Sequence, residues 1–141
     1  MRRAIFQTLL LTFSIIHLAN CSSTEINENA PEEMYKEAEG DIDSDRYQLA
    51  LDRLRMLKTK YPYSKFSVLA QLRIADVYFL QETFPESAAA YELFLDLHPK
   101  HEKAPYALYR IGESYFLDIP DNLARDLSSA YRALDAFKEY L

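Results

Sequence analysis

The strongest constraint on the fold is a helical pattern that the chain repeats at an interval of 37 residues, at positions 35, 72 and 109. The segments LRIADVYF (72–79) and YRIGESYF (109–116) share Arg, Ile, Tyr and Phe at matching positions, and YKEAEGDI (35–42) is a fainter copy. One helical unit cannot bury its own apolar face and must stack against its neighbours. The period therefore predicts a helical solenoid.

Proline residues indicate that each unit contains two helices. Pro62 and Pro99 each follow the end of a segment in which apolar residues recur at helical spacing, and the two prolines are 37 residues apart. After each proline the pattern predicts a short loop and then another helix. The expected helices begin near Glu32 and span 47–60, 66–80, 84–97 and 102–117, with a last one around Ala133, Phe137 and Tyr140.

The first helix of each unit has a fixed order of residue types, which is apolar, basic, variable, small and acidic. The small position is Ala38, Ala75 or Gly112. Two helices joined by a tight turn approach closely only where side chains are small, so these positions are predicted helix contacts. The basic and acidic positions form i, i+3 pairs, and we expect surface ion pairs, with a charge ladder along a groove as the alternative. These pairs are Lys36/Glu39, Arg73/Asp76 and Arg110/Glu113.

The second helices resemble the tetratricopeptide (TPR) pattern, which they match at Tyr47, Ala50, Leu54 and Pro62 and again at Phe84, Ser87, Tyr91 and Pro99. This resemblance implies an all-α fold, a right-handed TPR-like α-solenoid of helical hairpins with about three repeats. The repeats are expected at about 32–64, 65–101 and 102–141. Ala133 lies 46 residues after Ser87 instead of 37, which indicates an insertion within 118–129. Because the third repeat is incomplete, we expect a fragment of a longer protein.

The first 20 residues have the features of a secretory signal. Two arginines precede a largely apolar run of 16 residues (4–19), which is short for a membrane span. The sequence Leu18-Ala19-Asn20-Cys21 resembles a bacterial lipobox, which implies diacylglycerol and an N-acyl chain on Cys21. An ordinary signal peptide with an incidental thiol is the alternative. Residues 21–31 are polar and predict a flexible tether. By resemblance to enterobacterial lipoproteins, in which Asp after the cysteine retains the protein in the inner membrane, Ser22 implies sorting to the cell outer membrane.

The remaining composition argues against other classes of function. The formal net charge of −6 disfavours a nucleic-acid partner. No phosphate-binding loop or hydrolase motif occurs, so we expect no catalytic residues, no enzymatic activity and no cofactor apart from the lipid. His98 and His101 are the one candidate metal pair, but a loop pair beside lysines is more often solvated, so we expect no metal site.

The lipobox, the tether and the proline-closed repeats together resemble the BamD (ComL/YfiO) family, most specifically over LDLHPKHEKAPYALYRIGESYF (95–116). The resemblance implies a lipid-anchored scaffold of the β-barrel assembly (Bam) complex on the periplasmic face of the outer membrane. It also implies partners, namely a BamA-like barrel-inserting subunit, other Bam lipoproteins and unfolded outer membrane protein precursors. The alternative is another periplasmic TPR lipoprotein that organises cell envelope or division complexes.

In a TPR stack the first helices line the concave face, where extended peptides bind. The positions of the aromatic and acidic residues within the repeat place them on this concave face. They predict a groove that binds a peptide ending in an aromatic residue. The alternative is that these side chains only pack against the next repeat. The groove candidates are Leu72, Asp76, Phe79, Tyr109, Glu113 and Phe116, with Tyr35, Glu39 and Ile42 in the fainter first copy.

Overall fold

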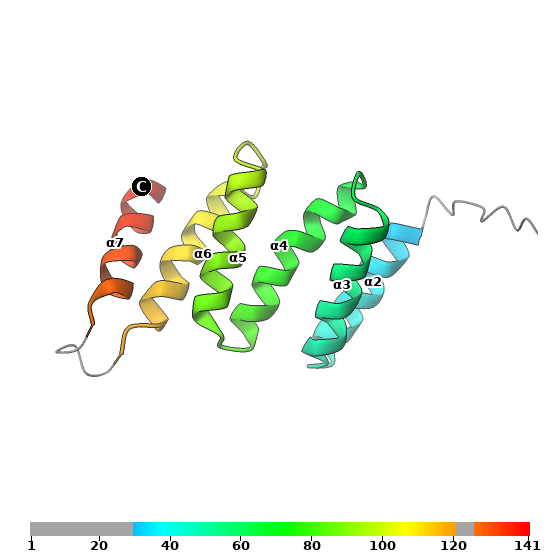
Figure 1. Cartoon of the computed structure of the whole chain (residues 1–141), viewed down its shortest axis with the longest axis horizontal. Coiled ribbons are helices and arrows are strands. Elements are labelled where there is room, and N and C mark those ends of the chain that lie inside the picture. Colours follow the sequence, from blue (N-terminus) through cyan, green and yellow to red (C-terminus); the bar gives the residue numbers. More distant parts are fainter. Residues whose placement is uncertain (1–29, 121–125) are drawn as a thin grey trace, which may run out of the picture.

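The computed structural model describes residues 30–120 and 126–141, and this part of the chain is helical, with no strand. The helices stand side by side in an elongated row from α2 to α7 (Figure 1). The six helices are α2 (Ala30–Asp43), α3 (Tyr47–Lys60), α4 (Lys65–Leu80), α5 (Phe84–Leu97), α6 (Ala104–Leu117) and α7 (Ser128–Tyr140).

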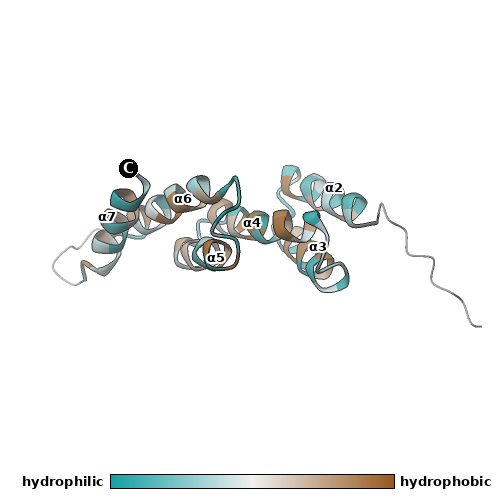
Figure 2. Ribbon diagram, turned by 90° about the horizontal axis from the view of Figure 1, so that it is seen from above, coloured by the Kyte–Doolittle hydropathy of each residue, from teal (hydrophilic) through white to brown (hydrophobic). Residues whose placement is uncertain are grey.

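Each helix packs mainly against the helix before it and the helix after it in the sequence, and α2 also contacts α4. Seen from above, α2 and α6 lie along one side of the row, α3 and α5 lie along the other, and α4 lies between them (Figure 2). This is the packing of a TPR-like solenoid made of successive helical hairpins. The predicted all-α fold is confirmed.

Local chemistry accounts for where the helices begin. The helices α3 and α5 have the predicted bounds, and α4 begins one residue early, at Lys65, because the Ser64 hydroxyl caps it by accepting a hydrogen bond from the Phe66 amide. The helix α6 begins at Ala104 instead of Glu102, since the Lys103 amide donates to His101 Nδ1 in the loop (3.1 Å). The helix α7 begins at Ser128, inside the range expected for the insertion.

The apolar core consists of two adjoining clusters, one from α2, α3 and α4 and the other from α4, α5, α6 and α7. Ala38 and Ala75 are fully buried at the predicted small positions. The Ser87 hydroxyl of α5 donates to the Ala75 carbonyl (3.2 Å). A Cβ atom at Gly112 would lie only 2.6 Å from Cε1 of Phe137 in α7. The small residues therefore lie where paired helices come closest.

The segment before Ala30 lies outside the described residues. The signal peptide over 1–20, the lipidation of Cys21 and most of the 21–31 tether therefore remain predictions. None of the helices in the described part has both the length and the apolar character needed to span a membrane.

Candidate functional site

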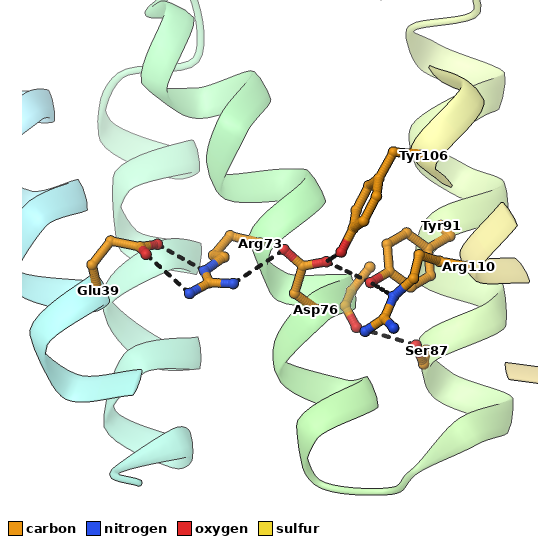
Figure 3. Close-up of polar contacts among 8 residues, drawn as sticks. Glu39, Arg73, Asp76, Ser87, Tyr91, Tyr106 and Arg110 are labelled. Carbon is orange, nitrogen blue, oxygen red and sulfur yellow. Dashed lines mark hydrogen bonds and ion pairs between the residues drawn. The ribbon is translucent and has the colours of Figure 1, made fainter. Parts of the chain in front are cut away.

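A polar network connects the first helices of the three repeats. It joins Glu39 of α2 to Arg73 and Asp76 of α4 (Figure 3). The Arg73 guanidinium donates to both Glu39 carboxylate oxygens (2.8 and 3.0 Å) and to Asp76 Oδ2 (3.3 Å). Arg73 thus ties the first repeat to the second.

Asp76 is the centre of this network, and its residue exposure is only 9%. The Tyr91 hydroxyl of α5 and the Tyr106 hydroxyl of α6 (2.8 Å) both donate to its Oδ1. Arg110 of α6 donates in turn to the Tyr91 oxygen (3.2 Å). A buried carboxylate needs several donors to offset its desolvation. Asp76 has these donors within the protein, which makes it a link between repeats rather than a free contact for a peptide.

The tyrosines of the network remain neutral hydrogen-bond donors. Burial raises the pKa of Tyr91 and of Tyr106, and the negative charge of Asp76 raises both further. Burial, with Glu39 close by, raises the pKa of Tyr35 to about 12. These hydroxyls are therefore protonated at neutral pH.

A cleft of about 330 Å³ opens beside the network, between α2, α4 and α6. Four of the predicted groove residues line it, namely Tyr35 and Glu39 of the first copy and Leu72 and Asp76 of the second. Leu72 is only 7% exposed and belongs mainly to the core. The full lining is Tyr35, Glu39, Leu69, Leu72, Arg73, Asp76, Lys103 and Tyr106.

Sequence reasoning missed Tyr106 and Leu69, although a signal was present. The two residues lie 37 positions apart, one turn before the register that defines the repeat. Extending the comparison by that turn would have placed both on the same face as Leu72 and Asp76. Lys103 gives no such signal, because it lies just before α6, in the loop.

The other predicted groove residues lie outside the cleft. The Arg110 guanidinium lies 3.5 Å from the ring centroid of Phe79, and Phe116 near the end of α6 is 59% exposed. Tyr109 packs against Phe137 and Tyr140 of α7, with ring centroids 6.0 and 5.6 Å apart. Tyr109 therefore lies at a contact between helices, as the packing alternative expects.

Two of the three expected ion pairs form within their helices, Arg73 with Asp76 (3.3 Å) and Arg110 with Glu113 (2.7 Å). The expected pair of Lys36 with Glu39 is wrong. Lys36 pairs with Glu32 (2.7 Å), and Glu39 binds Arg73 of the next repeat. Ile42, another groove candidate of the first copy, is buried at 5% exposure in the core.

The two loop histidines pack on one aromatic ring. The rings of His98 and His101 lie 5.4 and 5.3 Å from that of Phe94. Burial lowers the pKa of His98, and nearby positive groups, His101 and Lys58, lower it further. In the part of the chain that the structure describes, no group of three or more His, Cys, Asp or Glu residues is placed to hold a metal ion.

Comparison with known proteins places the chain among envelope proteins. The model of the YfiO family, described as outer membrane lipoprotein, matches residues 27–141. The outer membrane protein assembly factor BamD of Vibrio cholerae serotype O1 is 29% identical over 109 residues, which are 76% of this chain and 45% of that relative. The proteins of the same name from Neisseria gonorrhoeae and Rickettsia prowazekii are 33% identical over 81 residues and 25% over 100.

These matches cover 57% of this chain and 30% of the Neisseria relative, and 71% of this chain and 39% of the Rickettsia relative. The chain therefore spans less than half the length of these three relatives. The family model, in contrast, covers most of the chain. On that match and the repeated helical hairpins, the chain belongs to the YfiO (BamD) family of outer membrane lipoproteins.

Proposed function

We propose that this chain is part of a periplasmic scaffold that assists the assembly of β-barrel proteins in the outer membrane, and that it binds their unfolded precursors. The family match carries the proposal, because the relatives are named outer membrane protein assembly factors. It favours this role over that of another lipoprotein organising envelope or division complexes. The scaffold has no enzymatic role, and the proposed partners are a BamA-like subunit and other Bam lipoproteins.

The face formed by α2, α4 and α6 is the proposed precursor site. Its cleft combines the apolar and aromatic side chains of Leu69, Tyr35 and Tyr106 with one cation, Lys103, for which the described residues provide no ion-pair partner. Arg73 in the same cleft is already bound by Glu39 and Asp76. A peptide that ends in an aromatic residue carries a carboxylate at that residue. Lys103 therefore supports recognition of the carboxylate, while the aromatic ring fills the cleft.

Lys103→Glu tests this site, because the side chain is exposed and makes no capping hydrogen bond at the start of α6. An acidic residue there also favours the helix dipole, so the variant is expected to fold. Fluorescence anisotropy of a labelled peptide that ends in Phe measures affinity. We expect about a tenfold loss, the equivalent of about 1.4 kcal/mol, for this variant. We expect no change for Lys60→Glu, the matched control at the exposed end of α3.

A second peptide with an amidated end separates the two parts of the recognition. If the amidated peptide binds as tightly as the free acid and Lys103→Glu leaves both affinities unchanged, the proposed carboxylate site is wrong. If neither peptide binds the original chain, binding of precursors by this face is refuted.

A further inference from the structure

A second groove lies on the opposite side of α6. The helix α6 packs against both α5 and α7. Two adjoining cavities open here. One, of about 360 Å³, lies between these flanking helices, and the other, of about 620 Å³, continues it to the loop between α5 and α6. Leu108, which lines both, is two residues from Tyr106 and from Arg110, which places it about 200° around the helix from each. The groove is therefore separate from the cleft of the inner face.

The floor of this outer groove is apolar. Leu95 of α5 and Leu108 of α6 line both cavities and are half-buried, while Ile111 and Ala136 are buried beneath one of them. A groove with an apolar floor between two parallel walls is the shape that receives the apolar face of a helix. The walls are 14 and 13 residues long, or about 20 Å at 1.5 Å per residue.

The walls of the groove are acidic. Glu92 and Asp96 come from α5, and Asp135 and Glu139 come from α7. Asp96 and Glu139 line both cavities, and neither forms an ion pair with any other residue that the structure describes. The middle of the groove thus has a free carboxylate on each wall.

No nearby cation forms an ion pair with Asp96 or Glu139 among the residues that the structure describes. Lys100, in the loop between α5 and α6, lines the larger cavity with them but is not paired with either. Arg132 donates to the Tyr115 hydroxyl (2.7 Å), and that hydroxyl donates to Glu92 (2.9 Å). Arg132 and Glu92 are therefore connected through the Tyr115 hydroxyl, away from Asp96 and Glu139. Lys138 lies 3.9 Å from Asp135 in an exposed pair, which stabilises little.

We propose that this groove docks an amphipathic helix of another protein, with aliphatic side chains on one face and Lys or Arg residues along both borders. The aliphatic side chains cover Leu95 and Leu108, and the basic residues pair with Asp96 and Glu139. Charge complementarity selects this occupant, because an acidic helix or an anionic lipid surface would be repelled by both walls. The proposal does not depend on precursor binding at the inner face.

The test uses a synthetic helical peptide of about 14 residues, with leucines at i, i+3, i+4 and i+7 and lysines beside them. A second peptide carries glutamate in place of every lysine. Isothermal titration calorimetry with the full chain measures both affinities. We expect the lysine peptide to bind, its affinity to fall with added salt, and the glutamate peptide not to bind.

The informative variant is Asp96→Lys combined with Glu139→Lys, for which we expect about a tenfold or greater loss of affinity. Its control combines Glu33→Lys and Glu86→Lys, which changes the net charge equally at exposed carboxylates of α2 and α5 outside the groove. Circular dichroism confirms that both variants fold.

Three outcomes overturn the proposal. The first is no binding of the lysine peptide to the original chain. The second is an equal loss of affinity in the two double variants, which means that the peptide is attracted by the net charge of the protein and not by the carboxylates of the groove. The third is a dimer in light scattering that Asp96→Lys and Glu139→Lys dissociate, which makes a second copy of this chain the occupant.

Discussion

Replacing Gly112 by alanine tests the central packing inference, that a small residue in α6 is required by the approach of α7. Gly112 lies in the middle of α6, and a Cβ atom there would lie 2.6 and 2.7 Å from Cε1 and Cδ1 of Phe137. Carbon atoms that do not bond rarely come within 3.0 Å, so the ring must move. Phe137 also packs against Tyr109, which limits that movement.

Two opposing effects set the magnitude. Alanine in place of glycine within a helix gains about 0.8–1 kcal/mol. Overpacking a well-filled contact costs about 1–3 kcal/mol. We therefore expect Gly112→Ala to lower the free energy of unfolding by about 1 kcal/mol net, which for a domain of this size lowers Tm by about 4–8 °C.

Gly40, the only other glycine, provides the matched control. It is exposed in α2, and a Cβ atom there would meet nothing within 4 Å. Gly40→Ala thus gains the helix propensity without the clash and is expected to raise stability by about 0.5–1 kcal/mol. Thermal unfolding followed by circular dichroism at 222 nm compares the variants, and Phe137→Leu is expected to relieve the loss at Gly112. If both glycine variants raise Tm equally, the reasoning on close approach is wrong.

Three other expectations concern the polar network around Asp76, the dependence of stability on pH above 10 and the lipid anchor on Cys21. Asp76→Ala leaves two tyrosine hydroxyls without an acceptor and removes one of the two carboxylates that bind Arg73, which keeps Glu39. It is expected to cost about 2–4 kcal/mol in urea unfolding, whereas a loss under 1 kcal/mol would contradict the linking role. Because the pKa of Tyr35 is about 12 when folded and 10 when unfolded, its contribution is complete below pH 10 and is lost between pH 10 and 12. Tyr35→Phe is therefore expected to lose less stability than the original chain across that window, and an equal loss would refute the assignment. Globomycin, which blocks the lipoprotein signal peptidase, is expected to accumulate an unprocessed form, and Cys21→Ala is expected not to incorporate labelled palmitate; normal labelling of that variant would remove the proposed anchor.

The helices were predictable from the sequence because each depends on local spacing and local stop signals. The bounds of α3 and α5 follow from the prolines just beyond them and from apolar residues at helical intervals. The contact of Gly112 with the neighbouring helix was likewise expected from the small residue that recurs at that position.

The polar network was not predictable in the same way. Glu39 and Arg73 lie 34 residues apart, and Asp76 and Tyr106 lie 30 apart. Whether such side chains meet depends on the angle at which successive repeats stack, and no local pattern fixes that angle. For the same reason Asp76, predicted to face a peptide, is instead occupied by Arg73, Tyr91 and Tyr106.

Site-specific photocrosslinking tests most directly whether the face of α2, α4 and α6 receives β-barrel precursors. A benzophenone amino acid replaces Phe79 of α4 or Phe116 of α6, which lie outside the cleft but on the two helices that line most of it. Leu93, an exposed residue of α5, is the control position. Each variant is mixed with an unfolded β-barrel precursor and with the same precursor lacking its final aromatic residue. We predict crosslinks at the first two positions that weaken when the aromatic residue is removed, and little at Leu93. Crosslinks only at Leu93, or equal yields from both precursors, would contradict the proposed function.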